Sequence, residues 1–357
     1  MSFKCGIVGM PNVGKSTLFN ALTTSKKAQA ENFPFCTIDP NIGIVSLPDE
    51  RLSKISAISK SIKTINAAIT FVDIAGLVKG ASKGEGLGNK FLSHVREVDT
   101  IIHLTRCFDS EKIQNVNKDV DPIRDIEIIE TEILLSDLES LQKRLTKSNK
   151  KKLGKKELNF LEECLKLINH EKKLDELKKK FSKNLIKNSN LLSLKPKIIV
   201  CNIDEKNLPN GNKYSEACKK KFSDENIIIV CADIEDQIMN LQTKDRENFM
   251  FESGIKNTGL NNLIKTGYNT LGLSTFFTSG PEESRAWTIE NNSKAGDAAG
   301  VIHTDFKKKF IRAETVSHED FIKYKGFNEC KNIGKLRLEG KDYMVKDGDV
   351  MFFRTGA

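Results

Sequence analysis

Short apolar runs alternate with longer amphipathic stretches over much of the chain. The first run, at residues 3–8, leads into a glycine-rich loop and is typical of a buried strand. Runs of the same character lie at residues 68–72, 100–104, 197–201 and 226–230. Helical patterns separate several of them, which predicts an α/β fold with a mostly parallel sheet and helices on both faces.

The alternation stops between residues 121 and 194, where apolar residues take helical spacing. Asp121 and Pro122 have the residue types of an N-cap and a first helical position. Leucines recur every three or four residues up to residue 145, and a second apolar series runs from residue 158 to 168. A lysine-rich turn containing Gly154 separates the two series. We predict two antiparallel helices joined by a basic tip, a coiled-coil hairpin inserted into the α/β domain.

The pattern changes again after Gly272. Residues 276–353 contain short strand-like runs, scattered glycines and a hairpin signal at Asp347-Gly348. This predicts a separate small α+β domain. The predicted domains are therefore residues 1–120 with 195–272, an insertion of residues 121–194, and residues 273–357.

Composition excludes several classes of protein. The chain has 357 residues, 38% of them hydrophobic and 29% charged, and no apolar run approaches the ~18 residues of a membrane span. The amino-terminal residues pass into the first strand pattern without a targeting leader, so we expect a cytoplasmic protein with no membrane partner. The eight cysteines lack metal-ligand spacing. We expect most to be core residues, as at Cys5, Cys201 and Cys231.

Positive charge is concentrated in the helical segment. Residues 141–190 hold 16 Lys and Arg against 6 Asp and Glu, whereas the formal net charge of the whole chain is +9. One interpretation is a solvated helix face. The other is a polyanionic partner such as RNA, because a local excess of cations attracts phosphate groups.

The first strand pattern ends in a phosphate-binding signature. Residues 9–16, Gly-Met-Pro-Asn-Val-Gly-Lys-Ser, match GxxxxGK[ST] between a strand and a helical run. Backbone N–H groups and the helix N-terminus would surround phosphate oxygens. Lys15 would reach the β- and γ-phosphates, and Ser16 would bind Mg²⁺. The predicted nucleotide-binding residues of this loop are Asn12, Val13, Gly14, Lys15, Ser16 and Thr17.

Two further elements follow in the order of a switch NTPase. Thr37 would supply a second Mg²⁺ oxygen when the γ-phosphate is present. Asp73, directly after the apolar run at 68–72, would hold the metal through water. The Gly76 amide would then sense the γ-phosphate.

The base-recognition segment departs from the guanine-specific pattern Asn-Lys-x-Asp. Asn202, Ile203, Asp204 and Glu205 follow the strand at 197–201. Ile203 replaces the lysine, and Glu205 replaces the aspartate that pairs with guanine. Because glutamate is one methylene longer, its carboxylate should miss that pairing position. This weakens selection for guanine and favours ATP, with a tolerant GTPase as the alternative.

The usual catalytic glutamine is also missing. Leu77 stands where Ras-type enzymes place it, and leucine cannot orient a water. His103 is one candidate base, since neutral imidazole accepts a proton near pH 7, although a strand histidine can equally be a core residue. His94 is a weaker candidate. Alternatively, the absence of the glutamine indicates a nucleotide-gated scaffold with negligible turnover. A P-loop kinase is disfavoured, because no phosphoacceptor-site signature accompanies the loop in this sequence. Asn12 is a candidate for holding K⁺ near the phosphates.

Together these motifs resemble the YchF-type Obg-like ATPases over nearly the whole chain. The resemblance includes Asp-Ile-Ala-Gly-Leu-Val-Lys-Gly at 73–80, the divergent 202–205 segment, Arg-Ala-Trp-Thr at 285–288 and His-Thr-Asp-Phe at 303–306. It implies a Ras-like nucleotide domain, a helical insertion and a C-terminal TGS domain of β-grasp fold. It further implies a preference for ATP over GTP, a need for Mg²⁺, and association with the ribosome through the large subunit or whole particle, by rRNA or ribosomal proteins.

The resemblance also implies individual roles. The backbone at Ile203 would contact adenine with Asn202 beside it, and the family's catalytic histidine would map onto His103. The segment at 227–235 matches the Ser-Ala-Lys base-binding loop of GTPases only loosely, because Cys231 and Ala232 stand there.

Overall fold

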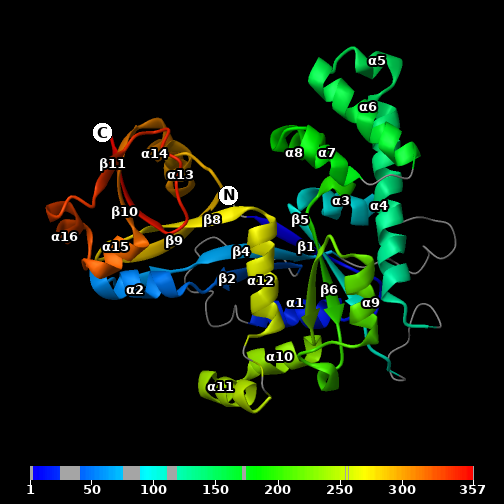
Figure 1. Ribbon diagram of the computed structural model, residues 1–357, viewed down its shortest axis with the longest axis horizontal. Helices are drawn as coiled ribbons and strands as arrows, with labels where there is room; N and C mark the ends of the chain where they lie inside the picture. The colour runs from blue at the N-terminus through cyan, green and yellow to red at the C-terminus, as the bar shows by residue number, and fades with distance from the viewer. Residues whose placement is uncertain are drawn as a thin grey trace.

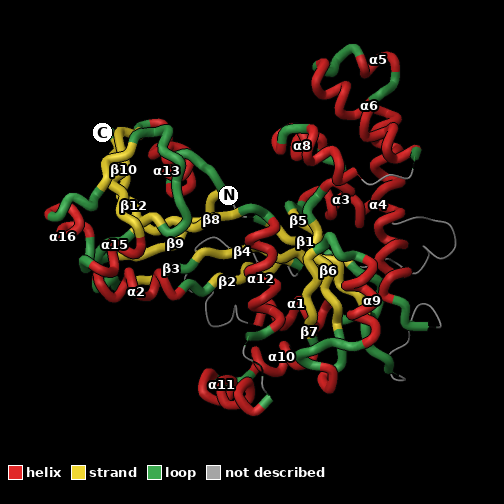
Figure 2. The backbone as a smooth tube through the Cα atoms, viewed as in Figure 1, coloured by secondary structure: helices red, strands yellow, loops and turns green. Residues whose placement is uncertain are grey.

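Two six-stranded sheets organise the chain in the computed structural model (Figures 1 and 2). The structure describes residues 3–24, 41–74, 89–110, 119–170, 174–253, 255 and 257–356. The first sheet belongs to the predicted nucleotide domain, and the second is built mainly from the carboxy-terminal residues.

The first sheet is parallel apart from one edge. In spatial order it contains β2 (Ile42–Leu47), β4 (Ala67–Asp73), β1 (Lys4–Val8), β5 (Thr100–Arg106), β6 (Lys197–Asn202) and β7 (Asn226–Val230). β2 runs antiparallel to β4, and the other neighbours are parallel. All five strands that the apolar runs predicted are confirmed. β5 is buried at all 7 positions, as in a strand covered on both faces.

Helices cover both faces of this sheet because its central strands are apolar on both sides. They are α1 (Lys15–Thr24), α3 (Asn89–Glu97), α9 (Lys213–Lys221), α10 (Ala232–Asn240) and α12 (Gly259–Thr270). Helix α11 (Thr243–Glu252) packs against α10 (Figure 1). Ile198 and Val200 of β6 pack in the same core as α1 and α12. Ile199 and Cys201, which alternate with them, pack beneath α9 on the opposite face.

The segment between β5 and β6 is helical. It contains α4 (Pro122–Arg144), α5 (Lys147–Lys150), α6 (Lys155–Asn169), α7 (Leu177–Lys180) and α8 (Lys183–Ser189). Asp121 accepts the Arg124 N–H at 3.0 Å, and Pro122 opens the helix, as their residue types predicted. Although α4 is 23 residues long, charged residues interrupt it. Among the described helices, none combines the length and apolar character needed to cross a membrane.

A buried carboxylate fastens the end of this segment to α4. Asp137 accepts the backbone N–H groups of Leu192 at 2.9 Å and Ser193 at 2.8 Å, and the Ser193 hydroxyl at 2.5 Å. Burial raises the pKa of Asp137, and the bonds from Ser193 and Leu192 oppose that rise. The segment also has its own apolar core, which includes Phe160 and Leu141.

The second sheet takes most of its strands from residues 273–355. In spatial order it contains β11 (Arg337–Glu339), β10 (Phe310–Ser317), β12 (Asp349–Thr355), β8 (Leu273–Thr278), β9 (Glu283–Glu290) and β3 (Lys63–Ile65). Its helices are α2 (Glu50–Ser59), α13 (Ala295–Ile302), α14 (Thr304–Lys308), α15 (His318–Lys323) and α16 (Phe327–Asn332). α13 packs in the core on one face, whereas α2 and α15 pack in the core on the other.

Two elements of this second layer come from the amino-terminal part of the chain. Strand β3 pairs in parallel with β9, and α2 buries Leu52 and Ile55 completely against Phe277 and Val350. Residues 50–65 were predicted to belong to the nucleotide domain. Their partners lie more than 200 positions away, and local periodicity carries no information about such pairing.

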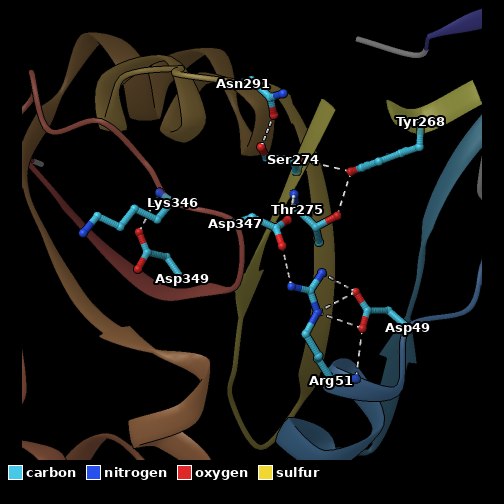
Figure 3. Close-up of polar contacts among 9 residues, drawn as sticks. All are labelled: Asp49, Arg51, Tyr268, Ser274, Thr275, Asn291, Lys346, Asp347 and Asp349. Atoms are coloured by element: carbon cyan, nitrogen blue, oxygen red, sulfur yellow. Dashed lines mark hydrogen bonds and ion pairs between the residues drawn. The ribbon is translucent and has the colours of Figure 1, made fainter. Parts of the chain in front are cut away.

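A polar network fixes α2 to the second sheet (Figure 3). Asp49 caps α2 and also binds the Arg51 guanidinium, at 2.8 Å from Nη2. Arg51 Nη1 reaches Asp347 at 2.6 Å, and Asp347 accepts the Thr275 N–H at 2.8 Å. The bond to Asp49 is the main cause that raises the pKa of Arg51 above its ordinary value. The Tyr268 hydroxyl of α12 joins the network by donating to the Ser274 carbonyl at 2.9 Å.

We predict that Leu52→Ala destabilises the second sheet by about 2–5 kcal/mol, because it leaves a cavity in the core shared with Phe277. Trp287 is the single tryptophan of the chain and lies on β9, so its fluorescence in urea follows this sheet. The control Ser53→Ala alters an exposed position of the same helix and should leave the midpoint unchanged. An unaltered Trp287 transition in Leu52→Ala would contradict the role assigned to α2.

Candidate nucleotide site

The phosphate loop connects β1 to α1 at the carboxyl edge of the first sheet. Asn12 and Gly14 adopt positive φ angles of 62° and 97°. The loop also lies directly against β5, since a Cβ on Gly9 would come within 2.3 Å of the Leu104 carbonyl oxygen. Glycine is therefore required at position 9 for close approach and at position 14 for the turn.

The Lys15 ammonium lies across this loop. Its Nζ donates to the carbonyl oxygens of Gly9 at 3.0 Å and Met10 at 2.9 Å. Burial lowers the pKa of Lys15, and the nearby Asp73 carboxylate opposes that shift. The cation is thus held at the loop by carbonyl dipoles that a phosphate could replace.

Asp73 ends β4 beside the loop, in register with Ile7 of β1. Its Oδ1 is buried and has no hydrogen-bond partner among the described residues. Burial raises the pKa of Asp73, and Lys15 partly counters this. A buried carboxylate oxygen with free acceptor capacity, beside the phosphate loop, fits a hydrated divalent cation. The other predicted switch residues, Thr37, Gly76 and Leu77, lie outside the described residues.

Near the predicted base-binding segment, Asn202 links β6, the phosphate loop and α10. It ends β6 and is 5% exposed. Its Nδ2 donates to the Val13 carbonyl at 2.9 Å, and its Oδ1 accepts the Ala232 N–H of α10 at 3.0 Å. A Cβ on Gly14 would lie 2.5 Å from Asn202 Nδ2, which is a second reason for glycine there. Asn202 was expected beside the base, and its bonds to the loop and to Ala232 were not predicted.

The residues after Asn202 offer few groups that could hydrogen-bond a nucleotide base. Ile203 is 2% exposed, and its N–H donates to the Val230 carbonyl at 2.8 Å. Its carbonyl is therefore the backbone group that could meet a base, and a carbonyl accepts the amino group of adenine. Glu205 opens a short 3₁₀ turn with an exposed side chain, and the Asn207 amide binds Asp204.

The two candidate histidines differ in their surroundings. His103 is 3% exposed in the middle of β5, in register with Val8 on one side and Ile199 on the other. Burial, assisted by Lys197 and Lys15, lowers the pKa of His103 to about 3, so its imidazole is neutral at pH 7. His94 is exposed on α3. The burial of His103 favours the core alternative, and its catalytic assignment stays a prediction.

Comparison with known proteins places this site in a family. Residues 4–132 match the family model MMR_HSR1, described as "50S ribosome-binding GTPase". Residues 273–356 match YchF-GTPase_C, described as "Protein of unknown function (DUF933)". The protein named "Ribosome-binding ATPase YchF" from Escherichia coli O157:H7 is 48% identical over 361 residues, which cover 99% of each chain. The chain belongs to the YchF family.

Two more relatives agree in length and fold. The Bacillus subtilis (strain 168) protein with the same name is 46% identical over 364 residues, again covering 99% of each chain. The solved structure "Structure of the Schizosaccharomyces pombe YchF GTPase" superposes with a TM-score of 0.88 at 38% identity, covering 99% of this chain and 98% of that one. The names given to YchF proteins thus include both ATPase and GTPase.

For this member of the YchF family we predict that Asn202→Ala weakens nucleotide binding about 10- to 100-fold. The substitution leaves the Val13 carbonyl and the Ala232 N–H unpaired, at a cost of about 1–3 kcal/mol. Calorimetric titration with ADP measures the change. Asn226→Ala removes an exposed amide that bonds Thr270 at the end of β7, and it should bind ADP like the unaltered chain. Equal affinities for the two variants would contradict the role of Asn202.

Proposed function

We propose that this chain binds and hydrolyses ATP with Mg²⁺ and acts as a nucleotide-controlled switch on cytoplasmic ribosomes. The observation that carries the proposal is the phosphate loop held between Lys15 and Asn202, in a chain 46–48% identical over its full length to proteins named ribosome-binding ATPases. The helical segment between residues 121 and 194 would be the inserted coiled-coil hairpin, and residues 273–357 the β-grasp TGS domain.

The residues around the loop have separable tasks. Backbone N–H groups of residues 12–17 would bind the phosphates, and Lys15 would exchange its two carbonyl contacts for β- and γ-phosphate oxygens. Ser16, Thr37 and Asp73 would hold Mg²⁺, which neutralises phosphate charge when bound. Gly76 would report the γ-phosphate to the switch. Asn12 remains a candidate for K⁺.

The group that orients the attacking water must differ from the glutamine of Ras-type enzymes. Leu77 offers neither donor nor acceptor. His103 would have to act from within β5, where its neutral ring is enclosed between neighbouring strands. A low intrinsic turnover that rises on the ribosome fits this arrangement, because the partner can complete the site.

Base choice separates the proposal from its alternative, a GTPase of the same fold. We predict that ADP binds at least about tenfold more tightly than GDP, since the Ile203 carbonyl can accept the adenine amino group while the guanine-pairing aspartate is absent. Paired calorimetric titrations at one Mg²⁺ concentration measure both affinities. Tighter binding of GDP than of ADP would favour the alternative, a GTPase of the same fold.

The ribosome contact is proposed for the tip of the helical segment, with rRNA phosphates as its partner. Four exposed lysines lie there, namely Lys151, Lys152, Lys155 and Lys156. Lys150 instead pairs with Glu162 at 2.7 Å.

We predict that changing these four lysines to glutamine makes ribosome binding less sensitive to salt. The slope of log affinity against log salt concentration should become shallower by about one for each phosphate that the variant no longer neutralises. Co-sedimentation with large subunits over a range of KCl concentrations measures the slope. A control variant replaces four exposed lysines of α9, Lys213, Lys219, Lys220 and Lys221, and should bind like the unaltered chain. An affinity that does not change with KCl concentration would indicate that the tip binds a ribosomal protein instead of RNA.

A further inference from the structure

Three cysteines that are distant in sequence meet at one buried point. Cys107 follows β5, Cys201 lies in β6, and Cys218 lies in α9. Their sulfur atoms all lie within 4.8 Å of one another, and each residue is 0% exposed. All three are free thiols. Within the described ranges, no other group of three or more His, Cys, Asp or Glu residues brings its ligand atoms this close.

The surroundings of these sulfurs are apolar. Ile126, Ile199 and Ile203 complete the buried cluster around them. Hydrogen bonds with Cys107, and then with Cys201, lower the pKa of the Cys218 thiol. The geometry places three sulfur donors around one point, in a medium that solvates charge poorly.

The type and number of the donor atoms restrict which ion can bind. Sulfur donors select soft ions such as copper(I) or zinc and discriminate against magnesium or calcium. Three sulfurs around one ion at ~2.3 Å would be separated by ~4.0 Å, compatible with the observed spacing. Structural zinc requires a fourth ligand, and no His, Asp or Glu joins the group in the described chain.

We propose that Cys107, Cys201 and Cys218 form a binding site for one soft monovalent metal ion of the copper(I) class. The thiolate is the ligand form of cysteine, so each thiol that coordinates the ion loses its proton to solvent, and each sulfur donates a lone pair to the ion. No electron transfer is involved. The inference is independent of the proposed ATPase function, although the site adjoins it: Cys201 directly precedes Asn202, and the Cys107 N–H donates to the Asn202 carbonyl at 2.8 Å.

The test is an anaerobic titration of the full chain with Cu(I), in competition with the coloured chelator bicinchoninate. Each mixture is incubated to equilibrium, since burial of the thiols requires local opening before the ion enters. We expect the unaltered chain to withdraw one equivalent of Cu(I). Cys218→Ser should bind at least about tenfold more weakly, because one of three ligands is removed.

The control is Cys164→Ser, which alters another thiol of 0% exposure, in the core of the helical segment. It should retain one equivalent of Cu(I). Circular dichroism establishes that each variant folds, and Cys107→Ala provides a second ligand deletion should Cys218→Ser unfold. Thermal unfolding adds a readout. Bound ion should raise the unfolding midpoint of the unaltered chain and of Cys164→Ser, but not the midpoint of the two ligand deletions.

Three outcomes would overturn the proposal. The first is that the unaltered chain withdraws no Cu(I) from the chelator. The second is equal affinity in the unaltered chain and in both folded ligand deletions. The third is displacement of Cu(I) by equimolar Zn²⁺, which would exclude selection for a monovalent ion.

Discussion

The side-chain amide of Asn202 is the interaction on which the nucleotide site depends. A trans peptide places its C=O and N–H groups on opposite sides. When Asn202 holds the Val13 carbonyl, the Gly14 N–H must therefore turn the other way, as binding a phosphate oxygen requires. The same amide accepts the Ala232 N–H, so the loop, β6 and α10 share one polar contact. Two positive φ angles in the loop are stabilised by this neighbour, since Asn12 and Gly14 flank Val13.

The two sheets are joined through β4, the strand that carries Asp73 of the site. β3 ends at Ile65 in the second sheet, and β4 begins at Ala67 in the first, so a single residue separates the two layers. Ala67 packs in the core of the second sheet, while Asp73 at the far end of β4 faces Lys15. A displacement of the second sheet relative to the first thus acts on the strand that carries the proposed metal-binding carboxylate. The Arg51 network and the core around Leu52 resist such a displacement.

Sequence pattern predicted the parts of the fold that are determined locally. The five parallel strands, the helical cap at Asp121 and the change of pattern before β8 at Leu273 all follow from apolar runs, capping residues and breaks in periodicity. The phosphate loop was equally accessible, because its signature needs only the order strand, loop and helix.

What the sequence did not predict depends on contacts between distant segments. The pairing of β3 with β9 joins residues 63–65 to residues 283–285. The convergence of three cysteines needs the β5 and β6 register together with the docking of α9. Spacing rules for metal ligands detect pairs on one turn or hairpin, so they are insensitive to ligands that come from three separate elements.

Strand β6 connects the helical segment to the nucleotide loop. Lys197 at its first position lies 2.5 Å from Glu130 of α4 and 3.1 Å from Glu225, and Asn202 at its last position holds the loop. These partly exposed ion pairs contribute little energy, about 0–1 kcal/mol each, but the pair with Glu130 defines where α4 meets the sheet. Strand β6 is buried at five consecutive positions from Ile198 to Asn202, and close-packed interiors move as units instead of deforming locally. A partner bound at the lysine-rich tip would therefore influence the phosphate loop mainly by moving α4 and β6 together.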